Sequence, residues 1–241
     1  MPIRPRLLLA AAIALSLRCE ASAQVAVPRE PVYSLDARAI VGANRIIGRT
    51  RFTRHGSSSM VRELAHAAAH GNAALAARYD RYFHASLVDF LREAPDAGLS
   101  RNDVGDARAC FIQVAFKVYD GQGFDDARGS FKGPGLWGEG AIAGMARGSS
   151  SLARLEFVER IKFLTGANRR FAALSDPSKQ RIYDFYAIGA ELLARGYQAA
   201  LRSANGLELA FLRKQARKQL KADLGVDPGR VHFTSSGIAV D

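Results

Sequence analysis

Cysteine and tryptophan are the scarcest residues of this 241-residue chain, which has two cysteines and one tryptophan. Cys19 lies in an apolar N-terminal stretch, so Cys110 would remain alone if that stretch were removed. A chain with one cysteine forms no internal disulfide, even in an oxidising compartment. Stability must then come from a packed apolar core, which a chain of this length can bury.

Long apolar runs are also rare, and the clear example lies at the N-terminus. Residues 7–17 are almost entirely apolar, follow two arginines and precede an Ala-Ser-Ala triplet at 21–23. This order predicts a Sec-type signal peptide over residues 1–23, cleaved before Gln24. The run is too short to span a bilayer, which needs about 20 apolar residues. A lipoprotein anchor on Cys19 is the alternative, but Arg18 stands where a lipobox has a small residue.

We therefore expect an exported protein, periplasmic or secreted, with no transmembrane segment in its mature form.

Basic residues outnumber acidic ones, because the chain has 34 lysines and arginines and 23 aspartates and glutamates, for a net charge of +11. Removal of residues 1–23, which carry a net charge of +2, leaves +9. Such a charge favours an acidic envelope component or an acidic protein as partner, and export argues against nucleic acid. A solvated basic surface without a partner fits the same charge, and the oligomeric state stays open.

Helical periodicity dominates the chain after residue 56. Residues 24–56 predict a basic, extended or partly disordered leader with a short ordered piece around residues 40–47. Residues 57–241 predict a single all-α domain, a bundle of five to six helices with a glycine-rich connection and a short extended C-terminal tail. The expected helices cover residues 56–71, 72–95, 102–121, 149–174, 175–201 and 206–225. Residues 230–234 read as a β-like segment of the tail.

Local chemistry sets several of these boundaries. Asn72 and Asn102 are predicted N-caps, since an asparagine oxygen can accept from the free amides of a first turn. Gly121 and Gly225 are predicted stops, where a left-handed conformation ends a helix. Apolar residues cover more than half the circumference of the 102–121 helix, which predicts a central helix with neighbours on several sides.

The last helix is amphipathic and supplies the main candidate binding surface. A predicted buried stripe comprises Leu209, Leu212, Ala216, Leu220 and Leu224. An adjoining basic stripe comprises Arg213, Lys214, Arg217, Lys218 and Lys221. The stripe could bind an acidic partner or remain a solvated helix face.

Glu63, His66 and His70 are candidate metal ligands, because their i, i+3, i+7 spacing places them on one side of a helix. Di-iron bundles use two Glu-x-x-His elements, whereas this chain has one copy. The zincin pattern also fails, because Ala67 stands where that pattern has glutamate. A solvated helix face is the alternative interpretation of these three residues.

The segment 132–144, KGPGLWGEGAIAG, contains the spacing G-x-G-x-x-G and Trp137. A dinucleotide loop needs a strand before it and a helix after it, and no such strand is predicted here. We predict no cofactor, and interpret the segment as a connection whose Trp137 either docks on the bundle or forms a contact surface. Cys110 reads as a core residue.

No catalytic residue is predicted. Asp103 and Asp106 belong to a group of aspartates that could include an acid–base pair, but capping and solvation explain them equally well.

Three stretches together resemble a family of uncharacterised exported bacterial proteins. These are NDVGDARACFIQVAFKVYDG, FAALSDPSKQRIYDFYAIGAELL and LGVDPGRVHFTSSGI, within a resemblance that spans roughly residues 60–240. The resemblance implies export and a helical domain, and implies no activity or site.

Two functions therefore remain open. The favoured one is a non-enzymatic binding or interaction protein with a basic surface. The alternative is a metal-dependent or otherwise unrecognised hydrolase that uses Glu63, His66 and His70.

Overall fold

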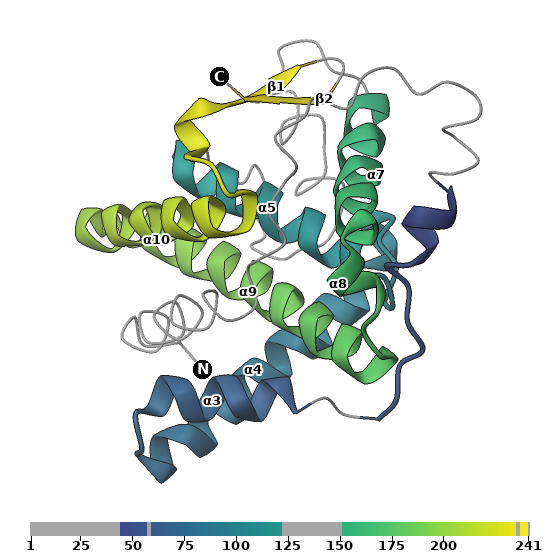
Figure 1. Cartoon of the computed structure of the whole chain (residues 1–241). Helices are drawn as coiled ribbons and strands as arrows, with labels where there is room; N and C mark the ends of the chain where they lie inside the picture. Colours follow the sequence, from purple (N-terminus) through teal and green to yellow (C-terminus); the bar gives the residue numbers. More distant parts are fainter. Residues whose placement is uncertain (1–43, 57–58, 122–150, 235–236, 241) are drawn as a thin grey trace.

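The computed structural model describes residues 44–56, 59–121, 151–234 and 237–240, which form a bundle of packed helices (Figure 1). The longer helices are α3 (Met60–Ala69), α4 (Ala73–Glu93), α5 (Val104–Asp120), α7 (Ser151–Ala167), α9 (Asp176–Arg202) and α10 (Gly206–Leu224). The shorter ones are η1 (Pro95–Ala97), α8 (Arg169–Ala172) and η2 (Pro228–Arg230). The predicted all-α bundle is confirmed. The glycine-rich connection lies outside the described residues.

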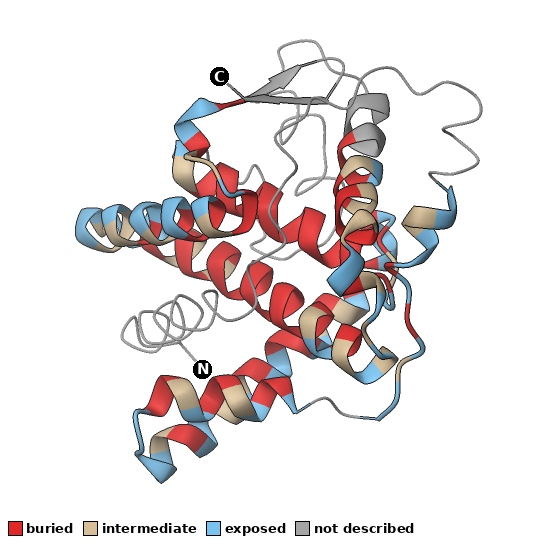
Figure 2. Cartoon of the chain, in the orientation of Figure 1, coloured by how far each residue is buried: buried red, intermediate tan, exposed pale blue. Residues whose placement is uncertain are grey.

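Helix α5 is the centre of the bundle. Every residue from Val104 to Val118 is buried, and the helix packs against α9, α10 and α7. Figure 2 shows the buried residues concentrated along α5 and α9. The prediction of a central helix is confirmed. Its polar residues are buried too. Arg108 bonds Asp223 and Thr165, whereas neither polar atom of the Gln113 side chain has a hydrogen-bond partner among the described residues.

The helix boundaries follow the predicted local chemistry at three positions. The side chain of Asn72 caps α4 by accepting from the backbone amide of Leu75 at 2.9 Å. Gly121 and Gly225 end α5 and α10 with φ values of 74° and 73°. Glycine adopts this left-handed conformation without the steric cost that a Cβ imposes.

The predicted cap of α5 is wrong by one residue. Asp103 is the N-cap, and its Oδ1 accepts from the amide of Gly105 at 2.9 Å. The side-chain oxygen of Asn102 instead accepts a hydrogen bond of 2.6 Å from the hydroxyl of Ser100. The side chain of Asn102 is thus bonded within the loop before α5, and the next residue, Asp103, caps the helix.

The described part of the predicted leader packs on the bundle. Residues 44–48 are helical, and an extended stretch follows them. Thr50 and Phe52 are buried, and they bond the loop before α5 through Val104 N to Thr50 O and Phe52 N to Asn102 O, both at 3.0 Å. Alternate residues of extended backbone face the same side, so every second residue reaches the core while Arg51 between them is exposed.

The tail forms a small antiparallel pair of strands, β1 (Val231–Thr234) and β2 (Gly237–Val240). Strand β1 lies where the sequence predicted a β-like segment, and β2 contacts α7. Among the helices of the described ranges, none combines the length and the apolar character that crossing a bilayer requires.

Candidate functional site

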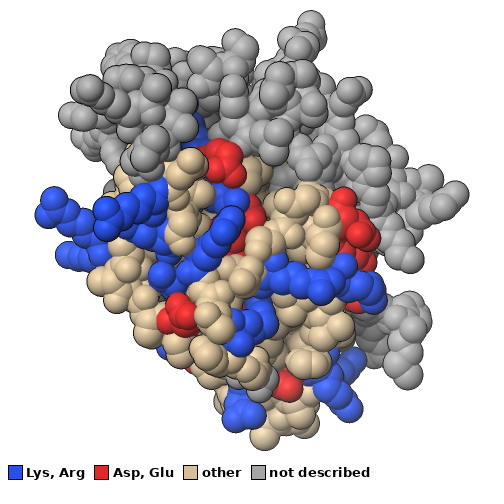
Figure 3. All heavy atoms as spheres, turned by 90° about the vertical axis from the view of Figure 1, so that its right-hand side faces the viewer, with Lys and Arg blue, Asp and Glu red and all other residues tan. Residues whose placement is uncertain are grey.

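The outward side of α10 presents the predicted basic stripe. All five of its basic residues are exposed: Arg213, Lys214, Arg217, Lys218 and Lys221. Leu212, Ala216, Leu220 and Leu224 of the same helix are buried, and Leu209 packs against the core while partly exposed. The predicted amphipathic arrangement is confirmed, and we call the five exposed residues the basic face of α10. The space-filling view in Figure 3 shows basic side chains covering more of one side of the molecule than acidic ones.

Few carboxylates neutralise this basic face within the described part of the chain. Arg217 donates to Asp227 Oδ2 at 2.8 Å, and within the described residues it is the member of the face that forms an ion pair. The amide of Gly229 and the guanidinium of Arg217 together lower the pKa of Asp227, so that carboxylate stays ionised. Asp223, the one acidic residue in the second half of α10, is buried on the opposite side. Three lysines therefore extend into solvent without an ion pair among the described residues.

A buried ion pair fixes α10 on the bundle. The Arg108 Nε atom of α5 lies 3.2 and 3.0 Å from the two carboxylate oxygens of Asp223, and Nη2 donates to the Asp223 carbonyl at 3.1 Å. Tyr186 of α9 donates to the same carboxylate at 2.5 Å, and Thr165 of α7 accepts from Arg108 Nη1 at 2.9 Å. Burial acts to lower the pKa of Arg108, but Asp223 outweighs it, so the pKa is raised. Residues of four helices, α5, α7, α9 and α10, therefore meet at this one ion pair.

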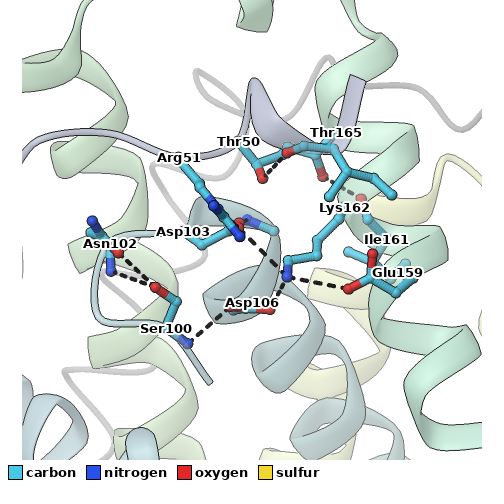
Figure 4. A network of polar contacts seen from close by, with 12 residues as sticks. Thr50, Arg51, Ser100, Asn102, Asp103, Asp106, Glu159, Ile161, Lys162 and Thr165 are labelled. Atoms are coloured by element: carbon cyan, nitrogen blue, oxygen red, sulfur yellow. Dashed lines mark hydrogen bonds and ion pairs between the residues drawn. The ribbon is translucent and has the colours of Figure 1, made fainter. Parts of the chain in front are cut away.

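A second polar cluster joins α7 to the start of α5 (Figure 4). Lys162 points between the two predicted acid–base candidates, with Nζ 3.0 Å from Asp106 Oδ1 and 3.6 Å from Asp103 Oδ2. Glu159 lies 3.3 Å from the same nitrogen, and Asp106 also accepts from the amide of Ser100 at 2.9 Å. Burial and the charge of Asp103 raise the pKa of Asp106, and Lys162 opposes them. Both aspartates have structural partners here.

A third cluster lies between α4 and α9, and no sequence motif indicated it. Arg195 bonds both Glu191 and Asp89, and Arg92 contacts Asp89 at 2.7 Å and Glu93 at 2.9 Å. Glu191 and Glu93 are both buried. Burial, opposed by Arg195 and reinforced by Glu93, raises the pKa of Glu191 to about 7. This carboxyl group therefore changes between its protonated and ionised forms near neutral pH.

The cluster contains buried oxygens without a hydrogen-bond partner in the described part of the chain. They are Glu191 Oε2, Glu93 Oε2 and the hydroxyl of Tyr82. An unpartnered buried carboxylate oxygen favours the protonated acid, which agrees with the raised pKa of Glu191. Cys110 is fully buried, and burial, reinforced by Glu191, raises the pKa of its thiol well above the ordinary value. The predicted core position of Cys110 is confirmed.

The candidate metal ligands lie on the outer helix α3. Glu63 accepts hydrogen bonds of 2.7 Å from Ser59 and from Arg181 of α9, so both carboxylate oxygens have partners. His66 is exposed, and His70 lies past the helix end in a left-handed conformation with φ of 46°. Within the described ranges no group of three or more His, Cys, Asp or Glu side chains could hold a metal ion. Trp137, the other candidate contact residue, falls outside these ranges.

The C-terminal third of the chain, residues 157–241, matches the model of DUF6683, a family of unknown function. The match begins within α7 and includes α9, the strands and the whole basic face of α10. It confirms the resemblance to a domain of unknown function over this range, shorter than the range of 60–240 expected from the sequence. No curated protein and no solved structure matches the chain.

Proposed function

We propose that the protein is exported and acts as a binding protein, which holds an acidic macromolecule of the cell envelope against the basic face of α10. The observation that supports this proposal is the exposure of five basic side chains on one helix, of which Arg217 alone has an ion pair within the described residues. An acidic polymer offers repeated negative groups along such a stripe, and association would be salt-sensitive.

The spacing of these charges adds a physical reason. Lys214 and Lys218 are one turn apart, as are Arg213 and Arg217, and Arg217 and Lys221. Each like-charged pair at i, i+4 destabilises a helix by roughly 0.2–0.5 kcal/mol. A negatively charged partner relieves this repulsion. The buried pair Arg108–Asp223 holds the helix in place, so a partner meets a basic surface that is already ordered.

The test compares two double charge reversals with the same change in net charge. Lys214→Glu/Lys218→Glu alters the basic face, and Arg78→Glu/Arg81→Glu alters exposed arginines of α4 at a distance from it. Binding to an immobilised acidic polysaccharide is measured at low salt. The first variant should bind at least about tenfold more weakly, because each exposed charge contact contributes about 0.2–1 kcal/mol and reversal makes it repulsive. The control should bind within about threefold of the unmodified protein.

Equal losses of binding in both variants would show that net charge alone attracts the polymer, and the proposed face would be refuted.

The alternative, a hydrolase that uses Glu63, His66 and His70, is tested by metal content. Stoichiometric zinc or iron in protein purified without a tag, lost on His66→Ala, would favour that alternative.

A further inference from the structure

A shallow pocket of about 350 Å³ lies on the bundle away from α10, and three arginines line it. The lining residues are Arg54, Leu91, Arg92 and Arg101. They come from the extended stretch before α3, the end of α4 and the loop before α5. None of these elements belongs to the basic face, so the pocket is a separate feature of the surface.

Arg54 is held in place from several sides. Its Nη1 donates to Asp184 Oδ1 at 3.0 Å, and its Nη2 donates to the carbonyl of Arg101 at 3.2 Å. The guanidinium also lies over the rings of Phe52 and Tyr183, with centroid distances of 5.6 and 5.0 Å. These contacts remove most of the conformational freedom of the side chain before any ligand arrives.

Arg92 and Arg101 complete the arrangement. Arg92 is exposed and is oriented by its ion pairs with Asp89 and Glu93. Arg101 is exposed and donates from Nε to the carbonyl of Leu91 at 2.6 Å. That bond fixes the start of its guanidinium, while its two Nη groups have no hydrogen bond or ion pair within the described ranges. Arg101 thus offers a fork of free donors at the pocket.

The compensating carboxylates differ from the arginines in exposure. Asp184 is fully buried, Glu93 is nearly so and Asp89 is half-buried, whereas Arg92 and Arg101 are exposed. The lining of the pocket therefore contains three guanidinium-bearing side chains and no carboxylate, although carboxylates outside the lining orient Arg54 and Arg92. Guanidinium groups bind phosphate oxygens in a fork geometry with charge-assisted hydrogen bonds. Because both Nη groups of Arg54 are already bonded, a tetrahedral oxyanion fits the fork of Arg101 with two further guanidinium charges beside it.

We propose that this pocket binds a phosphate group, carried either by a small soluble molecule or by a lipid headgroup. Arg101 supplies the direct hydrogen bonds, and Arg54 and Arg92 supply positive charge at the sides. The inference is independent of the function proposed for α10, because it involves other residues and a single anionic group rather than a polymer.

The experiment follows backbone amide shifts by NMR and heat by calorimetry as sodium phosphate is added at constant ionic strength. The unmodified protein should bind with a dissociation constant of about 1 mM, shifting the amides of Leu91 and Arg101. Arg101→Gln should weaken binding about tenfold, the effect of losing a charge-assisted fork. Arg81→Gln is the matched control on α4, exposed and outside the pocket, and should bind as the unmodified protein does. Arg101→Lys should fall between them, because it keeps the charge and loses the fork.

Vesicles of phosphatidylcholine, with and without phosphatidic acid, separate the two sources. They are tested in the Lys214→Glu/Lys218→Glu background, which removes attraction by the basic face. If the protein binds vesicles only when they contain phosphatidic acid, and Arg101→Gln abolishes that binding, the phosphate belongs to a lipid headgroup. If the protein binds free phosphate but not these vesicles, the phosphate belongs to a soluble molecule. Two results would overturn the proposal. The first is that phosphate shows no saturable binding and vesicle binding does not depend on Arg101. The second is that Arg101→Gln and Arg81→Gln weaken phosphate binding equally.

Discussion

Replacement of Glu191 by glutamine should remove a stability change that occurs near neutral pH. Glutamine has nearly the shape of the protonated acid and cannot ionise. Burial and the neighbouring Glu93 raise the pKa of Glu191 from 4.5 to about 7 in the folded protein, against the opposing charge of Arg195. The folded state therefore holds this proton more tightly than the unfolded state does, and the associated stabilisation is complete only below the unfolded pKa.

The sign and size follow from that shift. Stability contributed by Glu191 is present at acidic pH and is lost as pH rises through about 7, since ionisation then favours the unfolded chain. A rise in the pKa from 4.5 to about 7 corresponds to about 3 kcal/mol. Relative to the unmodified protein, Glu191→Gln should have similar stability at about pH 4.5 and should be more stable by about 3 kcal/mol at about pH 8.5.

Urea unfolding at a series of pH values measures this difference, and the comparison of two proteins cancels other groups that titrate in the same range. Glu159→Gln makes the same substitution at a half-exposed glutamate of α7 and is measured beside it for comparison. A curve for Glu191→Gln that runs parallel to that of the unmodified protein would refute the raised pKa. A variant less stable at high pH would show instead that the ionised Glu191–Arg195 pair is net stabilising.

Three further predictions concern packing and processing. Arg108→Leu should lower the free energy of unfolding by about 3–5 kcal/mol in urea, because Asp223 would stay buried without its cation; a loss below 1 kcal/mol would contradict this. Gly105→Ala should cost about 1–3 kcal/mol, because its Cβ would lie 2.8 Å from backbone of α7. Gly206→Ala, with open space around it, should change stability little. Mass spectrometry of the exported protein should find Gln24 at the N-terminus, and an intact residue 1 would refute cleavage.

Helices and their ends could be predicted because their causes are local. The cap at Asn72 and the stops at Gly121 and Gly225 depend on residues within one turn, which the sequence displays directly. The basic face of α10 was predictable for the same reason, since residues three and four apart share a side of a helix. Asn102 misled the prediction because a neighbouring serine competes for its side chain, and two adjacent polar residues offer similar caps.

The polar partners inside the bundle could not be predicted, because they join residues that are far apart in the chain. Arg108 and Asp223 are separated by 115 positions, and Arg54 and Asp184 by 130. Glu191 lies on a broad buried face of α9, and no local pattern distinguishes it from an exposed glutamate. Arg54 and Arg101 likewise meet at the arginine pocket because the extended stretch before α3 packs on the bundle. From its composition, that stretch was predicted only to be a leader.

Salt dependence of binding by the basic face of α10 tests the central claim most directly. The dissociation constant of the unmodified protein for an acidic polysaccharide is measured from low to physiological ionic strength, beside both double charge reversals. The proposal predicts that affinity falls steeply with salt for the unmodified protein and for Arg78→Glu/Arg81→Glu, and that Lys214→Glu/Lys218→Glu binds weakly with little salt dependence. The same affinity and salt dependence in all three proteins would contradict it.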